Sequence, residues 1–132
     1  SGGKYVAPQP IENKMRESPY VEQIMVVGAS QKFTGALIVP AWPLVRAALR
    51  NIGSKDADAP QELLVDSAEV RDLIRHQLDK YNAFFGHVEQ IKKFALLPKE
   101  WTVDGGELTP SLKMRRKVIE QKFAAHIAGL YD

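Results

Sequence analysis

Three apolar runs constrain the fold of this chain more than any other feature of its sequence. They lie at 21–27, 35–39 and 91–97 and end at Gly28, Pro40 and Pro98, and the first is rich in β-branched residues. Each has the length and composition of a strand. A short polar segment joins the first two, which predicts antiparallel neighbours. The third follows only after two helical segments, which favours a parallel crossover connection in the same sheet.

The segments between these runs have helical spacing. Pro10 opens a helix that we expect to pass through Met15, and Pro43 opens another that fades at Gly53. We expect a surface loop at 54–61. Asp66 and Glu69 then form a helix-start signature before the strongest apolar stripe of the chain, made of Val70, Leu73, Ile74, Leu78, Tyr81, Phe84 and Phe85.

The C-terminal part predicts a turn at 104–107 and a last helix that begins at 109–111. The stripe expected on that helix consists of Leu112, Ile119, Phe123, Ile127 and Leu130. The whole chain, 1–132, therefore reads as one α/β (α+β) domain. It should hold a small mixed sheet of about three strands flanked by helices, with a short two-stranded flap near the N-terminus.

Composition excludes several classes of function. The 132 residues contain no cysteine, so disulfide scaffolds, thiolate metal sites and cysteine nucleophiles are excluded. A net charge of +2 argues against a strongly basic nucleic-acid binder. The three histidines do not share metal-binding spacing, and neither a catalytic triad nor a close carboxylate pair is evident. We therefore expect no metal site in this chain.

Location and completeness give weaker expectations. The absence of cysteine suits a reducing cytoplasm at least as well as an oxidising compartment, and no apolar run approaches the roughly 20 residues that span a bilayer. The chain begins at Ser1 without a methionine and runs directly into patterned sequence, which predicts a part of a longer protein.

Two segments carry candidate contacts to an anion. Four of the five residues from Lys113 to Lys117 are basic, and we expect them at the start of a helix, where the macrodipole makes cations unfavourable. Such a cluster fits an anion contact or a solvated surface face, and the residues alone leave both open. The other segment is Gly2-Gly3-Lys4-Tyr5, whose glycines allow close approach to a ligand. Its spacing is not that of a Walker loop, and a flexible end or hairpin tip explains it equally.

Two longer motifs resemble a known family. The segment from Gly2 to Asn13, GGKYVAPQPIEN, is similar to the one that follows the hinge in long-chain acyl-CoA synthetases, which are AMP-forming enzymes of the adenylate-forming superfamily. LTPSLKMRRK, from Leu108 to Lys117, resembles their closing motif. In the wider superfamily a glycine precedes the motif's lysine, whereas Leu112 stands there in this chain, as in the long-chain branch.

The resemblance implies the C-terminal lid domain of a long-chain fatty acid–CoA ligase. Such an enzyme uses ATP, Mg²⁺ and coenzyme A to convert a fatty acid to its thioester through an acyl-adenylate. The N-terminal domain, as partner, would hold most substrate contacts, so this domain alone should be inactive and bind no cofactor tightly. Fatty-acid substrates leave peripheral membrane contact open.

Residue roles follow from the same resemblance. Lys113 matches the family's adenylation lysine, and Gly2, Gly3, Lys4 and Tyr5 match the flap that replaces it on the coenzyme A side after the domain rotates. Charge and position alone make Arg115 and Arg116 candidate contacts to coenzyme A phosphates. Two rival interpretations are a stand-alone anion- or nucleic-acid-binding α/β module, which predicts salt-dependent binding, and a structural domain that docks through an apolar surface.

Overall fold

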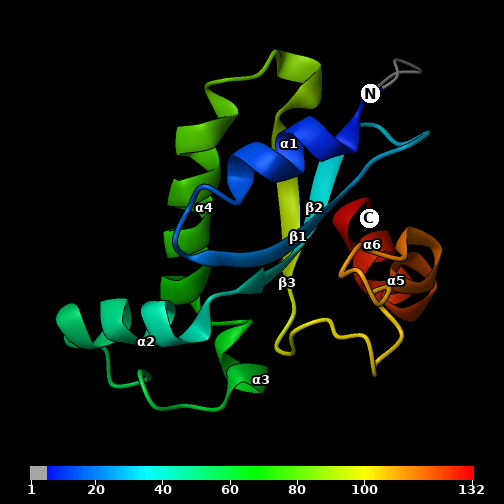
Figure 1. Cartoon of the computed structure of the whole chain (residues 1–132). Coiled ribbons are helices and arrows are strands. Elements are labelled where there is room, and N and C mark those ends of the chain that lie inside the picture. Colours follow the sequence, from blue (N-terminus) through cyan, green and yellow to red (C-terminus); the bar gives the residue numbers. More distant parts are fainter. Residues whose placement is uncertain (1–5) are drawn as a thin grey trace.

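A computed structural model of the chain describes residues 6–132, and its centre is a three-stranded sheet in the order β1-β2-β3 (Figure 1). Strand β1 (Val21–Val27) pairs antiparallel with β2 (Thr34–Pro40), and β2 pairs parallel with β3 (Ile91–Leu96). Both predicted pairings are therefore confirmed, as is the crossover through helices.

Helices precede, connect and follow the strands. Helix α1 comes before β1, α2 to α4 and the 3₁₀ turn η1 lie between β2 and β3, and α5 and α6 end the chain. Their bounds are α1 Pro8–Met15, α2 Trp42–Asn51, α3 Gln61–Leu64, α4 Ala68–Asn82, η1 His87–Glu89, α5 Arg116–Lys122 and α6 Ala124–Leu130.

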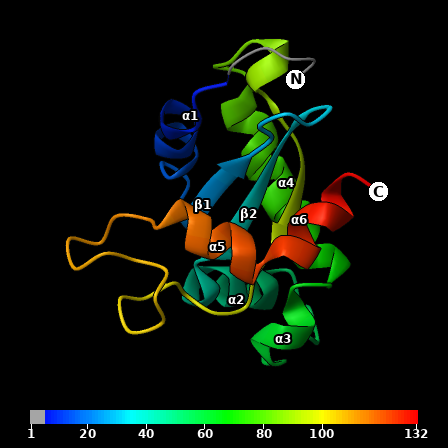
Figure 2. The same cartoon turned by 90° about the vertical axis from the view of Figure 1, so that its right-hand side faces the viewer.

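The sheet separates two apolar clusters because successive side chains of a strand point to opposite faces. On β1, Ile24 and Val26 belong to one cluster, whereas Met25 and Val27 belong to the other. The first cluster is covered by α1, α2 and α4, and the second by α5 and α6 (Figures 1 and 2). Both faces are covered, as the near-continuous apolar runs predict.

The loop expected at 54–61 is confirmed as far as Pro60, but the short helix α3, which starts at Gln61 and buries Leu64, was not predicted. One prediction about helices is wrong. The last helix begins at Arg116, not at 109–111, because Thr109 and Pro110 form a hairpin turn. It also breaks at Phe123, whose φ of −114° and ψ of 29° separate α5 from α6.

The expected N-terminal flap falls on the first residues of the chain, and residues 1–5 lie outside the described part. Within residues 6–132, no helix is both long enough and apolar enough to cross a membrane.

Candidate functional site

The basic segment lies on a short hairpin that connects β3 to α5. Its two arms pair through an antiparallel bridge between Leu108 and Met114. Below this bridge Arg115 N donates to Glu107 O over 2.8 Å, and above it Thr109 N donates to Lys113 O over 2.8 Å. We call residues 107–116 the lysine hairpin. Lys113 therefore occupies a fixed register position in the hairpin. The sequence predicts it at the start of a helix, and that prediction is wrong, because α5 begins at Arg116.

The tip of the lysine hairpin is a tight turn. Leu112 N donates to Thr109 O over 2.8 Å, and Pro110 occupies the second turn position, where its fixed φ is favourable. Leu112 has a φ of +66°, in the left-handed region. A residue in this conformation after a type I turn is typical of three-residue hairpin loops, and glycine is the usual choice. The Thr109 hydroxyl also accepts from Lys113 N over 3.1 Å.

Two cations on the hairpin have no partner among residues 6–132. The side chains of Lys113 and Arg115 are exposed, and neither forms a hydrogen bond or ion pair with another residue of that range. Both are thus available to a group from outside. Hydrogen bonds at both the N and the O of Lys113 hold its main chain, which limits the positions that its ammonium can reach.

Arg116 is held differently. Its guanidinium forms a two-point contact with Glu12 of α1, from Nη2 to Oε1 at 2.6 Å and from Nη1 to Oε2 at 2.8 Å. Glu12 is 1% exposed, and its Oε2 also accepts from Val26 N of β1 over 2.8 Å. The hydrogen bonds to Glu12, together with its negative charge, outweigh partial burial and raise the pKa of Arg116.

A second buried carboxylate anchors the other arm. Glu107 is 3% exposed and accepts from Lys122 Nζ of α5 at 2.5 Å and from Thr102 N at 2.9 Å. Burial alone would raise the pKa of Glu107. The hydrogen bonds from Lys122 and Thr102 and the charge of Lys122 outweigh that effect, so its pKa lies below the ordinary value.

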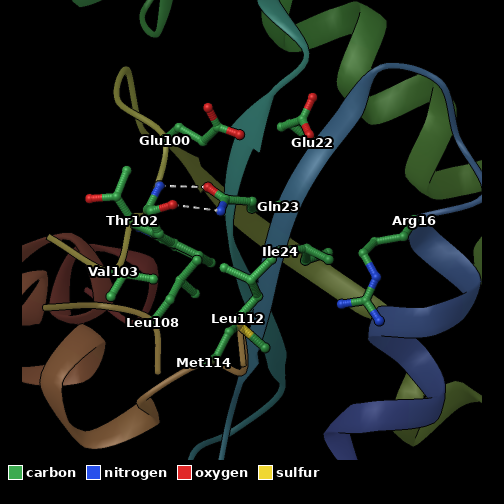
Figure 3. Close-up of a pocket in the computed structure, with 11 residues that line it drawn as sticks. Arg16, Glu22, Gln23, Ile24, Glu100, Thr102, Val103, Leu108, Leu112 and Met114 are labelled. Atoms are coloured by element: carbon green, nitrogen blue, oxygen red, sulfur yellow. Dashed lines mark hydrogen bonds between the residues drawn. The ribbon is translucent and has the colours of Figure 1, made fainter. Parts of the chain in front are cut away.

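A pocket of about 580 Å³ opens beside the hairpin (Figure 3). Leu108, Leu112 and Met114 of the hairpin gather next to Ile24 of β1. Across the opening lie charged side chains, among them Arg16, which follows the last residue of α1. On one side of the pocket, Gln23 Nε2 donates to Trp101 O over 3.0 Å and Gln23 Oε1 accepts from Trp101 N over 2.6 Å. The hairpin thus presents a cation at its tip and apolar side chains at its flank.

The structure brings together Lys113, Arg115 and Arg116, whereas Gly2, Gly3, Lys4 and Tyr5 lie outside the described residues. In residues 6–132 no group of three His, Asp or Glu side chains is arranged to bind a metal. Sequence reasoning missed the two anchoring carboxylates. For Glu12 a signal existed, since it stands between Ile11 and Met15 on the buried side of a helix, where an unpaired charge would be costly.

Comparison with protein families gives one match over the whole chain. Residues 1–132 match the model of the AMP-binding enzyme C-terminal domain. A long-chain-fatty-acid–CoA ligase of Mycobacterium tuberculosis, FadD15, is 37% identical over 132 residues, which are all of this chain and 22% of that protein. The ligase ACSBG2 of Gallus gallus is 28% identical, over 99% of this chain and 19% of its own length. The chain thus spans about a fifth of these relatives.

Solved structures share the fold. The adenylation and carrier-protein didomain of a carboxylic acid reductase from Segniliparus rugosus, in complex with AMP, matches 99% of this chain and 16% of its own. The TM-score is 0.77 and the identity 24%. A fatty acyl CoA synthetase of Mycobacterium tuberculosis matches 95% of this chain and 19% of its own, with a TM-score of 0.57 and 16% identity.

Proposed function

Because this chain belongs to the family of C-terminal domains of AMP-binding enzymes, we propose that it serves as the mobile C-terminal domain of a long-chain fatty acid–CoA ligase. The names of its relatives support this substrate class, and their greater length supports an N-terminal domain as its partner. None of the relatives named above supports the stand-alone anion- or nucleic-acid-binding module.

In the proposed reaction the fatty acid carboxylate attacks the α-phosphorus of ATP, and pyrophosphate leaves. The sulfur of coenzyme A then attacks the acyl carbonyl, AMP leaves, and the thiol proton is released. Lys113 supplies a positive charge near the carboxylate and α-phosphate in the first step. A fixed cation is most effective where charge is shared in the transition state, because it needs no reorganisation at that moment.

The second step uses other residues of the domain. We assign Gly2, Gly3, Lys4 and Tyr5 to the surface that faces coenzyme A, and Arg115 to its phosphates, because the Arg115 guanidinium has no partner within residues 6–132. The contact of Arg116 with a coenzyme A phosphate stays a prediction. Nη1 and Nη2 of Arg116 already bind Glu12, so a phosphate would have to share the guanidinium with that carboxylate. We place Mg²⁺ in the N-terminal domain.

The observation that carries the proposal is an exposed lysine at a hydrogen-bonded hairpin tip, with no side-chain partner among residues 6–132. The test uses a full-length ligase containing this chain with Lys113→Ala. We expect ATP–pyrophosphate exchange to fall by about 10²–10³-fold, the size of effect seen when one transition-state donor is removed. Thioester formation from supplied acyl-adenylate should be largely kept.

The matched control is Lys117→Ala, since Lys117 is also exposed and has no side-chain partner among the described residues. It should leave both half-reactions unchanged. Equal retention of both half-reactions in Lys113→Ala would contradict the proposed role. The isolated chain should fold, bind no cofactor tightly and form no acyl-CoA, so turnover by the pure domain would contradict the claim that its site is incomplete.

Location belongs to the same proposal. We place the enzyme in the cytoplasm with peripheral contact to membranes, where its fatty-acid substrates partition. Cell fractionation with and without a high-salt wash checks this, because salt screens the surface charges that hold peripheral proteins. Enzyme that resists the wash would contradict it.

A further inference from the structure

The link between Glu12 and Arg116 joins two parts of the chain that are 104 residues apart. Glu12 lies on α1, and Arg116 is the first residue of α5, three positions after Lys113. We propose that this ion pair positions Lys113 for adenylation, an inference that rests on the proposed function of Lys113. Glu12 and Arg116 are positioning residues that act through the hairpin.

The geometry of the carboxylate favours a positioning role. Glu12 accepts three hydrogen bonds, two from the guanidinium and one from Val26 N of β1. A two-point contact between a guanidinium and a carboxylate fixes direction as well as distance. Because Val26 N belongs to β1, the carboxylate is hydrogen-bonded to the central sheet. The first residue of α5 is therefore fixed relative to β1.

A short series of backbone contacts connects Arg116 to Lys113. Arg116 follows Arg115, whose N–H bonds Glu107 O and closes the base of the hairpin. From there the bridge at Met114 and the bond from Thr109 N to Lys113 O leave little freedom at the lysine. If the Arg116 end shifts, the base of the hairpin shifts with it, and the Lys113 ammonium is displaced.

Lys113 also lies in the same pocket as the Glu12–Arg116 ion pair. Glu12, Arg16, Lys113 and Arg116 line one pocket between α1 and the hairpin. An unneutralised carboxylate in this pocket would attract the Lys113 ammonium toward itself and away from an outside substrate. Neutralisation of Glu12 by Arg116 therefore keeps the lysine available. Loss of Arg116 brings both effects, whereas Glu12→Gln also removes the carboxylate and so brings only the displacement of the hairpin. Neither effect predicts loss of substrate binding.

The test compares Glu12→Gln with wild type in the full-length ligase. We expect kcat of ATP–pyrophosphate exchange to fall by about 10- to 100-fold, because a misplacement of about 1 Å can cost 10²-fold. KM for ATP and fatty acid should stay within about twofold, and thioester formation from acyl-adenylate should be kept. Arg116→Lys, which retains the charge, should recover part of the loss seen in Arg116→Gln.

Asn82→Ala is the matched control for stability. Asn82 is buried and bonds both N–H and C=O of Ile91 at the start of β3, and α4 lies on the face of the sheet opposite α5 (Figures 1 and 2). It should lower stability yet leave kcat of exchange unchanged in the folded enzyme.

A double-mutant cycle isolates the positioning effect. In the Lys113→Ala background, Glu12→Gln should cause no further loss of exchange. Equal losses in both half-reactions, an additive loss in the Lys113→Ala background, or unchanged exchange in Glu12→Gln would each overturn the inference while the proposed function stands. Unchanged exchange in Lys113→Ala alone would overturn both, since no lysine would then need positioning.

Discussion

The two ends of the lysine hairpin are anchored by buried glutamates in contrasting ways. Glu12 comes from α1, is bound at both oxygens by the guanidinium of Arg116, and reaches the sheet through Val26 N. Glu107 belongs to the hairpin itself and pairs with Lys122, only 15 residues away. One anchor therefore fixes the hairpin to the rest of the domain, whereas the other stabilises the C-terminal segment locally.

The contrast extends to the cations. The Arg116 side chain is 37% exposed and the Lys122 side chain 50% exposed. A planar guanidinium matches a carboxylate at two points, whereas an ammonium is a single point charge on a flexible stem. The long-range anchor thus has the contact of more fixed geometry, which agrees with the positioning role proposed for it.

The largest expected difference between the anchors is in stability. Arg116→Met removes the partner of a carboxylate that is 1% exposed, and breaking a buried pair in this way costs up to about 3–5 kcal/mol. Each carboxylate keeps one backbone bond, from Val26 N or from Thr102 N. Lys122→Met should cost less, about 1–2 kcal/mol, because Lys122 is half exposed and its loss removes one contact where the loss of Arg116 removes two. Urea unfolding of the isolated domain measures both. Equal costs would show that the two anchors are energetically alike.

The second way to separate the anchors is pH. The pKa of Glu107 is lowered in the folded state, so its contribution to stability is present above its ordinary value of 4.5 and is lost as pH falls through the folded value. The destabilisation caused by Lys122→Gln should therefore be full near neutral pH and shrink below about pH 4.5. Unfolding curves of wild type, Lys122→Gln and Lys117→Gln, recorded from pH 7 to 3, check this. A difference that stays constant throughout would contradict it.

Much of the fold could be predicted from the sequence, because its main elements have strong periodic signals. The β-branched runs of β1 and β2 and the stripe of α4 are long enough to indicate their structure locally. Ser67, which accepts from Val70 N, caps α4 one residue after the predicted Asp66. The short helix α3 has only four residues and no periodic signal of its own, so it depends on the tertiary burial of Leu64.

The site was harder to predict than the fold. The segment 109–111 suggested the start of a helix that would carry the four basic residues, whereas the hairpin depends on the pairing of Glu107 with Arg115 and on the turn at Pro110. The Glu12–Arg116 pair spans 104 residues, and no local pattern connects such positions. Motif resemblance therefore predicts a role for Lys113, but it gives no indication of the residues that hold the hairpin in place.

The smallest effect is expected at the hairpin tip, which both anchors support. Leu112 adopts a φ of +66°, which costs an L-residue roughly 1–2 kcal/mol, and its side chain is 69% exposed, so little burial stabilises it. Leu112→Gly removes this strain but adds about 0.5–1 kcal/mol of backbone entropy to the unfolded state. We expect a net gain of up to about 1 kcal/mol in unfolding free energy. The reverse control is Gly53→Ala, at a φ of +74° with no atom within 4 Å of the added carbon, and it should destabilise by about 1 kcal/mol. If Leu112→Gly destabilises as much as Gly53→Ala does, the leucine is held by contacts that outweigh its backbone strain, and the tip itself would be a third anchor of Lys113.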